Sequence, residues 1–275
     1  MTPATTTLPV IGGAIRLPEI PKYLQWLVSK QRDLEIQDPC YPDYLDQDWT
    51  AEVREGAQRL KDGGFTGRIG IHGAFDGLEL FTYDKKIREV IRTRFLQSLE
   101  FGAVLNASTM VIHSPFIAFG HGLVNYSPAS HRQYIIDAAH AILEDVLPVA
   151  AQMNCTLVIE CILDKNPLPL LELVRSFNSE HVRLSIDTGH AFIMQQDGGT
   201  APHQWVIEAG ELLGHVHLQD VDGLADRHWQ LGRGNINWAA FFYALGQLKH
   251  KPVLVLEVLE IAGSMQWLER NELGM

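Results

Sequence analysis

The feature that most constrains this chain is a regular alternation of apolar, β-branched segments with amphipathic ones. Eight segments have the composition of buried strands: residues 8–15, 33–38, 68–75, 108–115, 156–162, 182–190, 214–221 and 251–258. Strands that are apolar along their whole length are typical of a parallel sheet covered by helices on both faces. Eight such units in 275 residues predict a closed (β/α)8 TIM barrel, with a doubly wound open sheet as the alternative.

Helical periodicity occupies most of the intervals between these strands. The expected helices cover residues 86–102, 131–152, 167–177, 202–213 and 238–248. In the first, one face carries Ile87, Val90, Ile91, Phe95 and Leu99, and Gly102 is expected at the C-cap. The second directs inward Ile135, Ala138, Ala139, Ile142, Leu143 and Val146. We expect a long loop over residues 39–50, and no linker divides the chain, so residues 1–275 are predicted to form one domain.

Composition excludes several classes of protein. Hydrophobic residues make up 46% of the chain, which argues against disorder, and the net charge of −11 without a basic cluster disfavours a nucleic-acid surface. Three cysteines without disulfide spacing indicate a reducing, cytoplasmic location. The N-terminus does not have the pattern of a signal peptide, and no apolar run approaches the length of a membrane span.

Titratable side chains occur at the C-terminal ends of six successive predicted strands. They are His72, His113, Glu160, Asp187 (with His190 just beyond), His217 and Glu257. Any one of them alone is most often structural, but in a barrel these ends meet at one mouth, where active sites lie. Converging acids repel one another unless a cation compensates them. Glu160, Asp187, His217 and Glu257 therefore form the best candidate site for Mn²⁺, Mg²⁺, Co²⁺ or Zn²⁺, and the lack of a cysteine argues against structural zinc.

The segment after the seventh strand, residues 217–238, carries a second group of polar residues. Asp226 and His228 are spaced so that both can point toward the mouth from a loop. Arg233 lies between Gly232 and Gly234, where it either holds a substrate hydroxyl or phosphate or points to solvent. Glu35 either reaches the mouth or packs inside the barrel, while Trp229 and Phe116 are either walls of the site or core residues.

The stretches "LSIDTGHAF", "HVHLQDVDG" followed by "RHWQLGRGNINW", and "VLVLEV" resemble the xylose isomerase-like TIM-barrel superfamily. This superfamily contains sugar isomerases and epimerases and also endonuclease IV. In the epimerase members the positions matching Glu160, Asp187, His217 and Glu257 bind one divalent ion, and the two glutamates move the proton. The resemblance implies that His190 contacts the substrate. Arg233, His113 and His72 are further candidates, and His121 either orients substrate hydroxyls or is a solvated loop histidine. The implied substrate is a small sugar or sugar-like molecule.

The endonuclease IV branch implies a larger metal set. Its additional zinc ligands match His72, His113, His190, Asp226 and His228, so one ion is expected and as many as three are compatible with the sequence. Acidic loops after the second and third strands, without interleaved basic and aromatic residues, disfavour DNA binding. The alternatives are an inosose-type dehydratase, a multi-zinc phosphodiesterase, and a barrel whose metal site is structural or ligand-sensing. The resemblance leaves the oligomeric state open, since dimers and tetramers are both frequent among its members.

Overall fold

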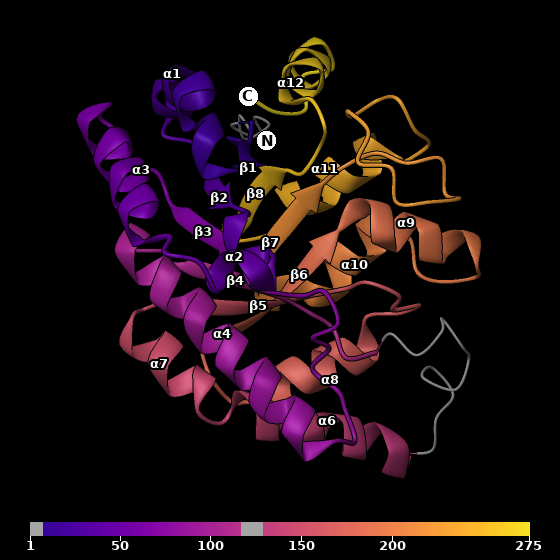
Figure 1. Ribbon diagram of the computed structural model, residues 1–275. Coiled ribbons are helices and arrows are strands. Elements are labelled where there is room, and N and C mark those ends of the chain that lie inside the picture. Colours follow the sequence, from indigo (N-terminus) through magenta and orange to yellow (C-terminus); the bar gives the residue numbers. More distant parts are fainter. Residues whose placement is uncertain (1–7, 117–128) are drawn as a thin grey trace.

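The computed structural model, which describes residues 8–116 and 129–275, is a closed barrel of eight parallel strands (Figure 1). The strands pair in chain order, and β1 closes the barrel against β8. Their bounds are β1 Gly12–Ile15, β2 Leu34–Ile36, β3 Ile69–His72, β4 Thr109–His113, β5 Thr156–Glu160, β6 Val182–Asp187, β7 Leu213–Leu218 and β8 Val253–Leu256. The prediction of a TIM barrel is confirmed, and the open-sheet alternative is wrong.

Helices surround this barrel, as the ribbon in Figure 1 shows. They are α1 Ile20–Lys30, α2 Pro42–Leu45, α3 Thr50–Asp62, α4 Lys85–Leu105, α6 Ala129–Leu143, α7 Val146–Gln152, α8 Leu168–Ser176, α9 Thr188–Gln196, α10 Pro202–Ala209, α11 Trp238–Gly246 and α12 Ile261–Arg270. Short 3₁₀ turns lie at η1 Leu17–Glu19, η2 Asp38–Cys40 and η3 Gly210–Leu212. Within the described ranges, no helix combines the length and the apolar character that crossing a bilayer requires.

Several predicted boundaries differ from the structure. The loop expected over residues 39–50 contains most of η2 and all of α2, and the helix expected over 131–152 is broken between α6 and α7. The strand expected to run to residue 190 ends at Asp187 because α9 begins at Thr188. His121, a candidate for orienting substrate hydroxyls, lies outside the described residues.

The packing of helix α4 differs from two of the expectations. Ile91, Phe95 and Leu99 face the core, but Ile87 and Val90 are 44% and 51% exposed, because they lie on the side of the helix that faces away from the barrel. Gly102 is inside the helix rather than at its end. A Cβ there would lie 3.0 Å from the Ile71 side chain of β3, so the glycine allows the helix to approach the strand closely.

Gly12 marks the tightest contact within the barrel wall. A Cβ at this position would overlap the backbone carbonyl of Asp33, which cannot move without disturbing the pairing of β1 with β2. We expect Gly12→Ala to destabilise the fold by about 3 kcal/mol or more, measured by urea unfolding. The matched control is Gly246→Ala at the exposed last residue of α11, where nothing lies within 4 Å and the change should be neutral or slightly stabilising. Equal effects of the two substitutions would contradict this interpretation.

Candidate metal centre

The sequence-predicted side chains gather at the mouth formed by the C-terminal ends of the strands. His72, His113, Glu160 and Asp187 end β3 to β6, His217 is the next-to-last residue of β7, and Glu257 follows β8 directly. A cavity of about 370 Å³ opens at this mouth. Seven predicted residues line it: His72, His113, Glu160, His190, Asp226, His228 and Glu257. Asp187 and His217 lie beneath them, fully buried.

Glu160, Asp187 and His217 form the centre of this group, with one ligand-type atom from each lying within 4.8 Å of the others. His217 Nδ1 is 3.0 Å from Glu160 Oε2 and 3.3 Å from Glu257 Oε2. Asp187 is fixed at the start of α9, because its Oδ1 accepts a hydrogen bond of 2.7 Å from the backbone N–H of His190. The structure therefore brings together all four residues proposed as ligands of the first ion.

Two buried atoms at this centre indicate what it can hold. Glu160 Oε2 and His217 Nδ1 are both buried and make no hydrogen bond with any described residue, although 3.0 Å separates them. Burying such groups without a partner is costly. Two ligands about 2.1 Å from one divalent ion lie about 3 Å apart, so the spacing and the donor types fit a shared cation.

A second group lies on the β3–β4 side of the mouth and shares Glu160. One ligand-type atom each from His72, His113 and Glu160 again lie within 4.8 Å of one another. The Phe75 ring stacks on His113 at 4.6 Å and meets the edge of His72 at 5.2 Å. Phe75 was not predicted from the sequence, and it holds both imidazoles in place.

A third group lies on the opposite rim, where Asp226 bridges two histidines. Its Oδ2 is 3.4 Å from His190 Nε2 and 3.0 Å from His228 Nε2. Gln219, at the end of β7, donates to Asp226 Oδ1 at 2.6 Å and to both oxygens of Asp187 at 3.2 Å. Gln219 therefore connects the third group to the centre, a role the sequence did not reveal.

Of the two positions expected for Glu35, at the mouth or inside the barrel, the structure shows the second. The side chain packs inside the barrel directly beneath the centre. Its Oε1 is 2.8 Å from His217 Nε2, and its Oε2 is 3.1 Å from His215 Nε2. His215 Nδ1 in turn contacts Ser185 Oγ at 2.9 Å. All four side chains are at most 1% exposed. Glu35 thus holds the His217 ring by Nε2 and leaves Nδ1 directed at Glu160.

The electrostatics of the centre reflect this crowding of charge. Burial opposes ionisation of Glu160, but His217 and its neighbours hold the pKa of that carboxyl well below its usual range. Burial likewise opposes protonation of His217, yet Glu257 and the other carboxylates raise the pKa of this imidazole well above its usual value. Burial raises the pKa of Asp187 to about 6. Positive charge is therefore strongly favoured at this position.

Arg233 lies away from the cavity lining and is exposed. Its guanidinium stacks on Trp229 at 4.5 Å, so Trp229 supports the loop, and the proposed substrate contact by Arg233 stays a prediction. Phe116 is 2% exposed and belongs to the core. Asp220 organises the same loop by accepting hydrogen bonds from the Gly232 backbone and from Trp238 Nε1.

Asp164, in the loop after β5, makes the stability of the fold depend on pH. Burial raises the pKa of this carboxyl to about 7, although it accepts hydrogen bonds from Ser114 Oγ and the Ile162 backbone. The folded state therefore keeps the proton longer than the unfolded state, and the cost of ionising Asp164 grows as pH rises from about 4 to about 7.

Asp164→Asn removes this cost because the amide cannot ionise. We expect the stability of the variant relative to wild type to increase by on the order of 2–4 kcal/mol between pH 4 and pH 8, measured by urea unfolding. Asp48→Asn, in an exposed loop, controls for the loss of one negative charge. A stability difference that does not change with pH would contradict the assignment.

Comparison with known proteins identifies the family to which the chain belongs. Residues 34–271 match the family described as xylose isomerase-like TIM barrel. The chain belongs to this family. A curated relative, the uncharacterised protein MJ1311 of Methanocaldococcus jannaschii, is 22% identical over 195 residues, which are 69% of this chain and 64% of that protein.

Two solved structures illustrate the shared architecture. The TTHB071 protein from Thermus thermophilus, in a structure obtained by soaking with ZnCl₂, is 25% identical with a TM-score of 0.72, covering 94% of this chain and 96% of that one. A D-tagatose 3-epimerase-like protein is 20% identical with a TM-score of 0.74, covering 96% of both chains. At 20% identity the likeness establishes the fold, and the chemistry has to be argued from the site itself.

Proposed function

We propose that this chain is a divalent-metal-dependent isomerase or epimerase that acts on a sugar or a related hydroxy-ketone. The observation that carries the proposal is the position of the two glutamates. Glu160 Oε2 and Glu257 Oε2 both lie within 3.3 Å of the same atom of His217, and both residues line the open cavity. A substrate in that cavity meets two carboxylates beside one cation-binding position.

Glu160, Asp187, His217 and Glu257 would hold the cation. When bound, it would polarise the substrate carbonyl and stabilise the enediolate charge that forms as a C–H proton leaves. Glu160 is suited to accept this proton, because its carboxylate is ionised and lines the cavity beside the proposed cation position. Glu257 is held through its Oε1 by Gln37 Nε2 at 2.6 Å, which fixes the direction from which it can deliver or remove a proton.

The destination of the proton decides the reaction. Return to the same carbon from the other glutamate gives epimerisation, and return to the neighbouring carbon gives isomerisation. Loss of a β-hydroxyl from the same intermediate gives dehydration, the alternative of the inosose dehydratase type. His190, at the cavity wall and 3.2 Å from Glu160 Oε1, is placed to orient a substrate hydroxyl.

The cavity favours an unphosphorylated substrate. No lysine or arginine is among the described residues that line it, and Asp76 and Glu79 add negative charge to its rim. The stretch 117–128, outside the described residues, also contains neither lysine nor arginine. A neutral polyhydroxylated molecule avoids the repulsion that a phosphate would meet from these carboxylates.

A second candidate function is hydrolysis of a phosphoester by several metal ions. It is favoured by the two further groups, His72 with His113 and Glu160, and Asp226 with His190 and His228, which flank the centre. Two or three ions there would supply the positive charge that the cavity wall lacks, and would activate water for in-line displacement.

Metal analysis combined with a proton-exchange assay separates the two functions. The purified protein would be analysed for bound metals, then incubated in D₂O with a panel of ketoses, inososes and hydroxy-keto acids. One exchangeable ion per chain with deuterium uptake beside a carbonyl supports the sugar enzyme. The hydrolase would be favoured over the sugar enzyme by three tightly bound zinc ions, cleavage of an abasic duplex or a simple phosphodiester, and no deuterium uptake on any substrate.

A further inference from the structure

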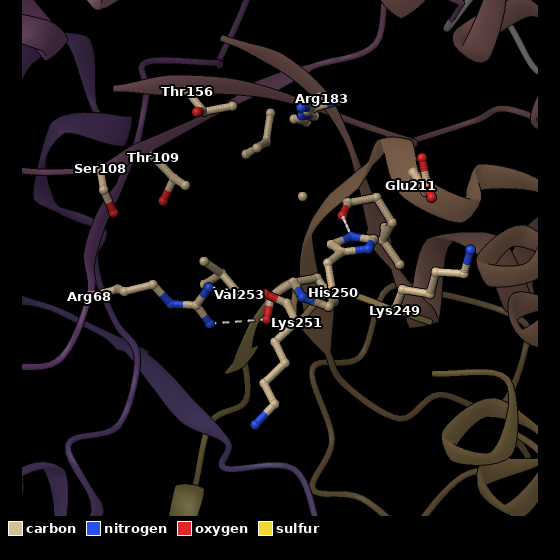
Figure 2. A pocket seen from close by; sticks show the side chains of 14 residues that line it. Arg68, Ser108, Thr109, Thr156, Arg183, Glu211, Lys249, His250, Lys251 and Val253 are labelled. Carbon is tan, nitrogen blue, oxygen red and sulfur yellow. Dashed lines mark hydrogen bonds between the residues drawn. The ribbon is translucent and has the colours of Figure 1, made fainter. Parts of the chain in front are cut away.

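A second cavity lies at the opposite end of the barrel, where the strands begin. It has a volume of about 500 Å³. Thr109, Thr156, Leu213 and Val253, the first residues of β4, β5, β7 and β8, contribute to its lining. Figure 2 shows polar side chains from these strand starts and from the loop before β8 surrounding this space. The residues of the proposed metal centre all lie at the other end of the strands.

Positive charge dominates the lining of this cavity. The cationic side chains are Arg68, Arg183, Lys249 and Lys251, and Glu211 is the only acidic residue in the described lining. Arg68 is neutralised, because its Nε and Nη2 contact both oxygens of Asp33 at 2.7 Å. The other three have no ion pair with any described residue, which leaves an excess of two positive charges. On a chain with a net charge of −11, such a local excess attracts anions selectively.

Two details indicate that the cavity wall is shaped for a ligand. Thr109 is 8% exposed, and its Oγ1 is buried without a hydrogen-bond partner among the described residues. A side chain at Gly70 on the neighbouring strand would overlap this hydroxyl, so the glycine keeps the space beside it free of other protein atoms. Gly214 has a similar effect on Arg183, because a Cβ there would lie 2.7 Å from the Arg183 Cβ and displace its side chain.

From this arrangement we propose that the cavity at the N-terminal end of the barrel binds a small molecule that carries a phosphate group. A guanidinium can bind phosphate oxygens in pairs, and two lysines add charge without fixed direction. The Thr109 hydroxyl, costly to bury unpaired, gains an acceptor from the phosphate. The proposal does not depend on the chemistry at the mouth, because the two cavities share no lining residue.

Isothermal titration of the metal-loaded protein with inorganic phosphate and with glycerol 3-phosphate tests the proposal. We expect saturable binding with a Kd below about 5 mM at low salt, weakened as salt is raised. Arg183→Gln should weaken it about tenfold or more, and Thr109→Val, which removes only the hydroxyl, about fivefold. Lys85→Gln, at the exposed start of α4, removes a charge elsewhere and should have no effect.

The same titration after removal of the metal by a chelator distinguishes this cavity from the mouth. Binding at the proposed site survives metal removal and is still weakened about tenfold or more by Arg183→Gln. Should Arg183→Gln impair folding, the double replacement of the exposed Lys249 and Lys251 by glutamine takes its place. Absence of binding, binding that disappears with the metal, or equal weakening by Lys85→Gln would each overturn the proposal.

Discussion

Replacing Glu160 by glutamine should reduce deuterium uptake into the substrate by about 10²–10⁴-fold, even when the variant is saturated with metal. Glutamine keeps the size of the side chain and one acceptor oxygen, but it cannot take up a proton. The residue is almost fully buried beside His217 and lines the cavity, so no bulk base can reach the same position. Single-turnover exchange in D₂O, followed by NMR, measures the effect.

Asp187→Asn is the matched control for the loss of a ligand. Asp187 belongs to the same group but is 0% exposed and does not line the cavity, so it has no access to substrate. Its replacement should weaken metal affinity, and exchange should recover when metal is added in excess. If Glu160→Gln also recovers in excess metal, Glu160 is only a ligand and the proton-transfer proposal fails.

The barrel could be predicted from the sequence because the same hydrophobic pattern is repeated in every strand–helix unit. Each strand is buried on both faces, so each of the eight appears as a short continuous apolar segment that differs from the amphipathic helices around it. Boundaries were less predictable where one residue has two roles. Asp187 ends β6 and also caps α9, so strand and helix meet without a loop between them, and the start of the helix at Thr188 was missed.

Candidate site residues could be predicted where the barrel topology alone determines their position. Those whose position depends on contacts across the barrel were missed. The C-terminal end of any parallel strand faces the mouth, which is why Glu160 and His217 could be placed from their positions along the chain. The contact between Glu35 and His217 joins residues 182 positions apart and depends on the barrel register. The one available signal was a carboxylate between Leu34 and Ile36 in a short apolar strand.

The direction of the Arg233 side chain could not be predicted from the sequence for a different reason. Loop side chains are directed by the local backbone geometry. Gly232 adopts φ +82 and its N–H is held by Asp220, and the turn places the Arg233 guanidinium over the Trp229 ring. Neither the G-x-G pattern nor its resemblance to family members determines this direction.

Glu35→Gln should weaken metal binding by about 10–100-fold while leaving the barrel folded. The carboxylate lies against two imidazoles at once: its Oε1 is hydrogen-bonded to His217 Nε2, and its Oε2 is 3.1 Å from His215 Nε2. Glutamine has one acceptor oxygen, so its NH₂ group must face the N–H of one of these rings. Either His217 turns and Nδ1 no longer points at Glu160, or the proton on Nε2 moves to Nδ1 and blocks the ligand atom.

Competition with a chromophoric chelator measures the metal affinity of this variant, and thermal unfolding with and without metal gives a readout independent of turnover. Glu100→Gln, on the exposed face of α4, is the matched control and should bind metal as the wild type does. The stabilisation by added metal should shrink in Glu35→Gln, since stabilisation by a ligand follows its affinity. Unchanged affinity would mean that Glu35 only satisfies buried histidines in the barrel interior and that His217 is held by its strand alone.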